Sequence, residues 1–217
     1  MKKLILFLLL LVGLFSTIAQ AQSPDRYGLR VGYSASGAVF IYQGSGNAYD
    51  RVDARLATDI SLMAEWDIFR WLTITAEPGW VHRGYKRDLT TFFSRWGSTG
   101  GSRIQLEYLT LPVLARIKPA SWRLAPYLEA GPRLDFLLSR TIEDTGSGSY
   151  ERAVFEEYNR VTGGVSLGAG LELAHFSPVR LSAGYRINFD TFTSYSDEAI
   201  TVRNRSAALW FGLSYAF

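Results

Sequence analysis

The sequence predicts an all-β protein, an eight-stranded antiparallel up-and-down transmembrane β-barrel. Eight segments alternate apolar and polar side chains with a period of two, which is the pattern of a strand with one apolar face. The connections between these segments alternate between short and long. The last segment runs to the final residue, Phe217, so no later strand can pair with its free edge. An earlier strand must do so, and the first segment is the simplest candidate. Pairing of the first and last segments would close a barrel.

The N-terminus has the features of a secretory signal. Lys2 and Lys3 precede an apolar run at residues 4–18, and Ala19-Gln20-Ala21 fits a cleavage site. A retained membrane anchor would need about 20 apolar residues, and this run is shorter. We therefore expect a signal peptide at residues 1–21 and one barrel domain at residues 22–217.

Composition excludes several classes of function. Without the signal peptide the chain carries 21 basic and 20 acidic residues, so no basic excess remains to bind nucleic acid. The chain has no cysteine, which excludes disulfides and thiolate metal sites.

The eight predicted strands each have one apolar and one polar or small face. In the second strand, for example, Leu56 and Ile60 oppose Asp59 and Glu65. The strands are expected at residues 27–42, 54–66, 71–85, 103–117, 124–140, 161–174, 179–192 and 202–217.

The lengths of the connections orient the barrel. Residues 67–70, 118–123 and 175–178 make short turns, and residues 43–53, 86–102, 141–160 and 193–201 make longer loops. Outer-membrane barrels have short periplasmic turns and long external loops. The pattern thus predicts a barrel in a Gram-negative outer membrane with both chain ends in the periplasm.

A soluble lipocalin-like barrel shows the same alternation with the faces reversed. Three features favour the membrane. The predicted strands are longer than the roughly 9 to 11 residues that cross a bilayer. Small residues crowd the polar face, namely Gly28, Gly32, Gly164, Gly168, Gly170, Gly184 and Gly212. Aromatic residues gather near both interfaces, with Trp66, Trp71, Trp122, Tyr215 and Phe217 on the turn side and Trp80, Tyr85, Tyr108, Tyr185 and Phe189 toward the loops.

Charged residues recur on the predicted lumen face. An eight-stranded barrel is filled by its side chains, and an unpaired buried charge is costly, so these charges should form a plug of ion pairs. A gated polar path and a catalytic carboxylate pair are the alternatives. The expected lumen residues are Arg30, Asp59, Glu65, Glu77, Arg83, Arg103, Glu107, Arg133, Asp135, Glu172, Arg180, Arg186 and Asp190.

Prolines mark irregular positions in three consecutive strands. Pro78, Pro112, Pro126 and Pro132 cannot donate to a strand ladder, which predicts a bulge or a weakened seam there. The fourth strand is apolar on both faces, so its register is the least well specified.

The same region carries a family resemblance. The segments Glu107-Tyr108-Leu109-Thr110-Leu111-Pro112-Val113-Leu114-Ala115-Arg116 and Pro126-Tyr127-Leu128-Glu129-Ala130-Gly131-Pro132-Arg133 resemble paired strands of the PorT-like outer-membrane β-barrels of Bacteroidetes. The resemblance implies a small outer-membrane barrel, of which some relatives assist gliding or type IX secretion. It carries over no catalytic residue. The terminal Phe217 resembles the signal read by the barrel assembly machinery.

No catalytic, cofactor or metal site is predicted. His175 and Ser177 have the His-x-Ser spacing of the barrel lipid A deacylases, but they lie in a periplasmic turn without a suitable acid nearby. Two histidines on separate strands, His82 and His175, make a weak case for metal. In the long loop at residues 86–102, the candidate contacts for lipopolysaccharide or a protein partner are Phe92, Phe93, Arg95 and Trp96.

These observations lead to one expected function and three alternatives. We expect a small, monomeric, non-enzymatic barrel with a filled lumen and an accessory, interaction or structural role. Its partners would be outer-membrane lipid and lipopolysaccharide, the barrel assembly machinery, and a secretion or surface protein. The alternatives are a narrow pore for small solutes, a lipid-modifying enzyme and a soluble lipocalin-like binder.

Overall fold

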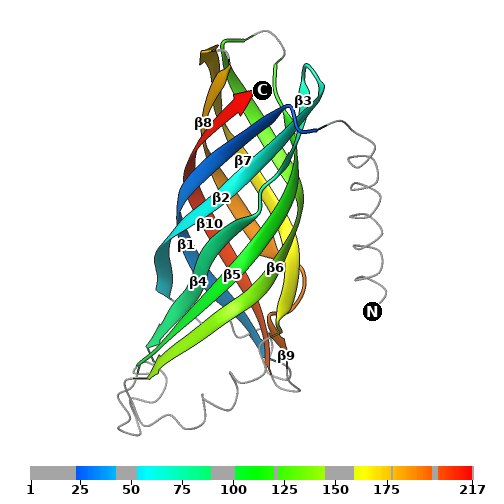
Figure 1. Ribbon diagram of the computed structural model, residues 1–217. Helices are drawn as coiled ribbons and strands as arrows, with labels where there is room; N and C mark the ends of the chain where they lie inside the picture. Colours follow the sequence, from blue (N-terminus) through cyan, green and yellow to red (C-terminus); the bar gives the residue numbers. More distant parts are fainter. Residues whose placement is uncertain are drawn as a thin grey trace, which may run out of the picture.

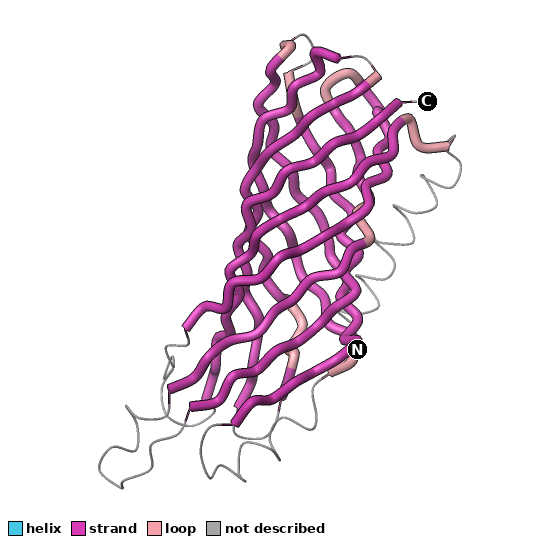
Figure 2. Tube along the Cα trace, turned by 60° about the vertical axis from the view of Figure 1, so that its left-hand side comes forward, coloured by secondary structure: helices cyan, strands magenta, loops and turns pink. Residues whose placement is uncertain are grey.

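The computed structural model describes residues 23–42, 53–88, 101–119, 122–144, 159–176, 178–196 and 200–216. They form one closed sheet of antiparallel strands (Figures 1 and 2). Among these residues no helix is long and apolar enough to span a membrane. The strands are β1 (Arg26–Tyr42), β2 (Asp53–Phe69), β3 (Leu72–Ala76), β4 (Gly79–Asp88), β5 (Gly101–Ile117), β6 (Leu124–Asp144), β7 (Val161–Phe176), β8 (Val179–Asp190), β9 (Tyr195–Ser196) and β10 (Ile200–Ala216).

The first and last long strands close the barrel. β1 pairs with β10 along its whole length, from Arg26 opposite Ala216 to Tyr42 opposite Ile200. β3 and β4 share one position in the ring, between β2 and β5, and the two-residue β9 only extends the edge of β10. The ring therefore has eight positions, which confirms the predicted up-and-down barrel. The start of β1 and the end of β10 lie at the same end as the β2–β3 turn (Figure 1).

The predicted third strand is two strands because of Pro78. β3 ends at Ala76 and β4 begins at Gly79. The Pro78 carbonyl still accepts a hydrogen bond from the Leu62 amide at 2.9 Å, and the Glu77 amide donates to Pro112 O at 3.0 Å. Pro112, Pro126 and Pro132 remain within the ladders of β5 and β6. Between β5 and β6, however, the pairs stop at Pro112–Arg133 and resume at Ala115–Ala130, so the predicted weakened seam is found at Pro78 and at Pro132.

A second irregularity lies between β2 and β4. The register shifts between the Ala54–Tyr85 pair and the Ile60–Trp80 pair. Side chains satisfy backbone groups here: Ser36 Oγ is 3.0 Å from both the amide nitrogen and the carbonyl oxygen of Gly84. Gly84 has a φ of 145°, which disfavours a residue with a Cβ. Arg83 and Tyr85, two residues apart on either side of Gly84, both point into the interior, as strand alternation requires.

The apolar faces of the strands point outward. Phe211 and Leu128 are 72% and 67% exposed, and neighbouring strands expose similar side chains. The interior is lined mainly by arginine, glutamate, aspartate, serine and glycine, and it also buries Met63, Tyr85, Ile104, Leu106, Tyr108, Tyr127 and Trp210. This is the arrangement that hydrocarbon surroundings require, and it is the reverse of a lipocalin-like barrel.

Aromatic side chains are exposed at the turn end of this apolar surface and farther along it. Trp71, Trp122 and Tyr215 lie at the turn end, and Trp80 and Tyr185 lie on the outer surface of β4 and β8. Tyr85 and Tyr108 were expected at the outer interface, and that expectation is wrong. Both are 0% exposed in the lumen, because they lie on the inward side of regularly alternating strands: Tyr85 is two residues from the buried Arg83, and Tyr108 is two residues from the buried Leu106 and Thr110.

Candidate functional site: the charged lumen

The described part of the lumen buries as many arginines as carboxylates. Alternate residues of each strand point inward, so charges placed at every second position meet inside the ring. The buried set comprises the arginines Arg30, Arg83, Arg116, Arg133, Arg180 and Arg186 and the acids Glu65, Glu77, Glu129, Asp135, Glu172 and Asp190.

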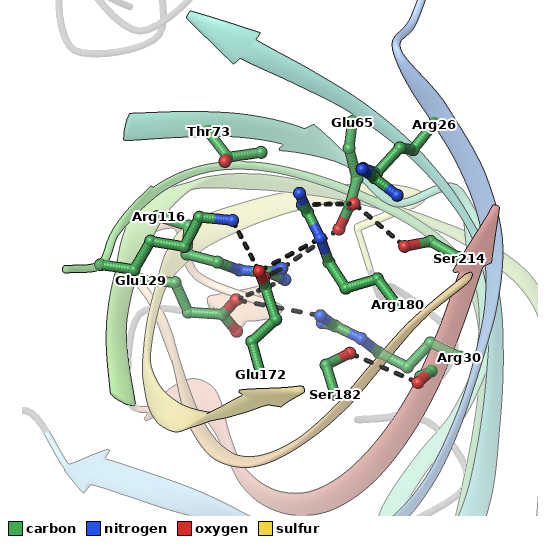
Figure 3. A network of polar contacts seen from close by, with 12 residues as sticks. Arg26, Arg30, Glu65, Thr73, Arg116, Glu129, Glu172, Arg180, Ser182 and Ser214 are labelled. Carbon is green, nitrogen blue, oxygen red and sulfur yellow. Dashed lines mark hydrogen bonds and ion pairs between the residues drawn. The ribbon is translucent and has the colours of Figure 1, made fainter. Parts of the chain in front are cut away.

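Arg116 is the centre of the cluster nearest the short turns. It is 0% exposed, and its Nη1 donates to Glu65 Oε1 at 3.1 Å and Glu172 Oε2 at 3.4 Å. Its Nη2 donates to Glu129 Oε2 at 3.3 Å. The guanidinium also lies over the Tyr127 ring, 4.5 Å from its centroid. One cation from β5 thereby holds carboxylates from β2, β6 and β7 (Figure 3).

Arg180 and Lys118 complete this cluster at the periplasmic rim. Arg180 Nη1 donates to Glu65 Oε2 at 3.4 Å, and its Nη2 donates to Asp67 Oδ2 at 3.3 Å. Lys118 Nζ donates to Glu172 Oε1 at 2.6 Å. These contacts tie together strand ends that are not neighbours in the ring.

A central layer joins the turn-side cluster to the rest of the lumen. Arg186 donates from Nη1 to Glu77 Oε2 at 2.7 Å and from Nε to Glu129 Oε1 at 2.9 Å. Arg30 pairs with Glu77, and its guanidinium lies 3.5 Å from the Trp210 ring centroid. Because Glu129 also contacts Arg116, the two layers form one network.

The third cluster lies toward the long loops. Arg83 binds Asp135 with two hydrogen bonds, at 2.7 and 3.1 Å. Arg133 bridges Asp135, at 2.7 Å from its Nε, and Asp190. Asp190 also accepts from Ser194 Oγ at 3.1 Å. Both acids are therefore held from more than one strand.

A cavity of about 60 Å³ separates the central layer from the loop-side cluster. Arg30, Glu77, Arg83 and Arg133 line it together with Asp59. This volume has room for a few water molecules between polar walls. Asp59, expected to pair within the lumen, has no ion pair among the described residues.

The structure places five of the principal lumen residues in these ion pairs, namely Glu77, Arg133, Asp135, Glu172 and Arg186. Glu107 was expected in the lumen, and that expectation is wrong. It lies on the outer surface, 37% exposed, with its Oε1 3.8 Å from His82 Nε2. The fourth strand turns Ile104, Leu106 and Tyr108 inward, so Glu107 faces out.

Sequence reasoning missed Arg116 and Glu129. Arg116 follows an apolar run in which neither face looked polar. Counting along each strand could have found both residues, because residues an even number of positions apart face the same side. Arg116 is six positions from the inward Thr110, and Glu129 is four and six positions from the inward Arg133 and Asp135.

Several predicted residues lie outside the described part of the chain. They are the signal peptide at residues 1–21, the loop residues Phe92, Phe93, Arg95 and Trp96, Ser177, and Phe217. Arg103 and His175 lie in β5 and β7, but their side chains are not described. No group of three metal-binding side chains occurs within the described ranges.

Comparison with known families supports what the geometry indicates. A family model described as outer membrane protein beta-barrel domain matches residues 19–196. The chain belongs to this family. It is accordingly an outer-membrane β-barrel protein, and its apolar outer surface faces lipid.

Solved outer-membrane barrels resemble this family member in structure. Neisserial surface protein A is 15% identical with a TM-score of 0.49, covering 91% of this chain and all of its own. OprG from Pseudomonas aeruginosa is 9% identical with a TM-score of 0.47, covering 91% and 99%. The protease OmpT from Escherichia coli is 12% identical with a TM-score of 0.48, covering 91% and 99%. No curated protein matches this outer-membrane barrel in sequence.

The loop-side cluster gives the first testable prediction. Arg133→Ala is expected to destabilise the barrel by about 2 kcal/mol, because Asp190 loses its nearest cation while Asp135 keeps Arg83. The measurement is urea unfolding in lipid vesicles followed by tryptophan fluorescence. The matched control is Arg160→Ala, since Arg160 is exposed. An unchanged unfolding midpoint for Arg133→Ala would count against the plug.

Proposed function

We propose that this protein is a non-enzymatic, monomeric barrel whose lumen is closed by ion pairs and whose role is structural or accessory. The supporting observation is the connected network of buried arginines and carboxylates. Glu129 alone contacts Arg30, Arg116 and Arg186, which come from three different strands. Such a lumen stiffens the scaffold and leaves partner contacts to the loops and the two rims.

The partners follow from this scaffold role. We propose outer-membrane lipid and lipopolysaccharide, the barrel assembly machinery during insertion, and a secretion or surface protein. The strand segments at residues 107–116 and 126–133 support a place among the PorT-like barrels.

Planar-bilayer recording tests the closed lumen. The refolded wild-type protein is expected to give no steady current at moderate voltage, because side chains and their ion pairs fill the ring. A porin reconstituted in the same way serves as the positive control. The folded fraction is checked by gel mobility with and without boiling. Discrete current steps that scale with the amount of folded protein would overturn this proposal in favour of a narrow pore.

A further inference from the structure

Two arginines on the outer surface differ from those in the lumen. Arg203 and Arg205 of β10 are exposed and two residues apart, so both point outward. Each buried arginine of the lumen contacts at least one carboxylate. Within the described part of the chain, neither Arg203 nor Arg205 has a carboxylate partner. Within the described ranges, therefore, no carboxylate neutralises their positive charge.

The height of these arginines places them at the edge of the lipid. The outward residues of β10 toward the turn end are apolar and exposed, with Leu209, Phe211 and Leu213 at 61%, 72% and 50%. The apolar band of such a barrel is about 25 Å tall, and its strands are tilted by about 40° and rise about 3.3 Å per residue. A strand therefore needs about ten residues to cross the band. Counting from Tyr215, the outward residue at the turn-side interface, such a span ends at Arg205.

The surroundings of Arg205 form a platform with open space beside it. Its guanidinium lies over the Phe189 ring of β8, 5.4 Å from the centroid, which restrains the charge at the surface. On the other side Arg205 is paired with Gly37 of β1, and a Cβ built on Gly37 would meet no atom within 4 Å. β10 runs between β1 and β8 (Figure 1), so the site spans three adjacent strands.

We propose that Arg203 and Arg205, with Phe189 and Gly37, bind a phosphate group of the phosphorylated glycolipid in the external leaflet. The arginines lie toward the long-loop end of the barrel, which is the external end in this class of protein. Guanidinium groups bind phosphate oxygens in pairs of hydrogen bonds. The small Ala207, next outward from Arg205, leaves room for the lipid chains to pass over Leu209 and Phe211. This inference rests on the proposed contact with lipopolysaccharide and deepens it, because it assigns the residues of the site and the phosphate group that they bind.

The test compares two purified lipids on the folded protein in detergent. Bis-phosphorylated lipid A is titrated against the wild-type chain, and binding is followed by native mass spectrometry. Arg203→Gln/Arg205→Gln is expected to weaken binding about 30-fold, since each arginine near an anionic lipid surface contributes about fivefold. Phe189→Leu is expected to weaken it by a smaller factor, because the platform under Arg205 is lost. Lipid A without phosphates should bind the wild-type chain as weakly as the double variant does.

Arg70→Gln is the matched control, because Arg70 is an exposed arginine at the opposite, turn-side end. It should bind bis-phosphorylated lipid A like the wild type, and all variants should keep the heat-modifiable gel mobility of a folded barrel. Equal affinity of the double variant and the wild type would overturn the site. So would equal affinity for the phosphate-free lipid, or full competition by inorganic phosphate at the lipid's own concentration.

Discussion

Replacing Arg116 with methionine is expected to lower the free energy of unfolding by about 3–5 kcal/mol. Methionine has a similar reach, so the loss is one of charge and hydrogen bonds rather than of volume. Glu65, Glu129 and Glu172 would be left around a neutral side chain in the lumen, where their mutual repulsion is weakly screened. Urea unfolding in lipid vesicles, followed by tryptophan fluorescence, measures the change.

Arg70→Met is the control for this experiment. Arg70 is exposed in the β2–β3 turn, so its loss should change stability by no more than about 0.5 kcal/mol. The stability of Arg116→Lys should lie between those of Arg116→Met and Arg70→Met. Lysine keeps the positive charge but lacks the planar guanidinium that contacts three acids. If Arg116→Met unfolded at the same urea concentration as Arg70→Met, Arg116 would not be the centre of the cluster.

Gly84→Ala is expected to cost about 3 kcal/mol or more, or to prevent folding. The φ of 145° is unfavourable for alanine, and its Cβ would lie 2.0 Å from the Ile104 carbonyl oxygen. That oxygen is backbone in the neighbouring β5, so relief requires the β4–β5 ladder to move. The readout is the fraction of heat-modifiable protein after refolding, with urea unfolding for whatever folds.

Gly37→Ala is the matched substitution, because the added methyl group would meet no atom within 4 Å. It should refold like the wild type and unfold within about 0.5 kcal/mol of it. Wild-type refolding and stability of Gly84→Ala would show that the bulge between β2 and β4 does not require glycine.

Alternation in the sequence predicted the closed barrel and most of its lumen face. On β1, β2, β7, β8 and β10 one face is plainly apolar, so the side that faces lipid follows from the pattern alone. On β5 both faces are apolar, so residue types did not mark Tyr108 rather than Glu107 as the inward residue, although alternate residues from Ile104 to Arg116 are buried without a break. Assigning such a strand one residue out of step exchanges its lumen and lipid faces, and that is how Glu107 came to be expected in the lumen.

The pairing of individual charges could not be predicted from the sequence either. Arg30 meets Glu77 and Arg186 meets Glu129, although these residues lie on strands that are not neighbours in the ring. Which side chains meet across the lumen depends on strand tilt and stagger, properties of the closed barrel as a whole. Composition predicted that the charges must pair, and only the three-dimensional structure assigns the partners.

The balanced set of lumen charges also affects the chain before it folds. An outer-membrane protein reaches its membrane through water, where the apolar residues at every second position of strands such as β8 would otherwise favour aggregation. Arginines and carboxylates interspersed with those apolar residues keep the unfolded chain hydrated and hinder hydrophobic clustering. The charged residues that stabilise the folded barrel thus also help to keep the unfolded chain soluble before it inserts into the membrane.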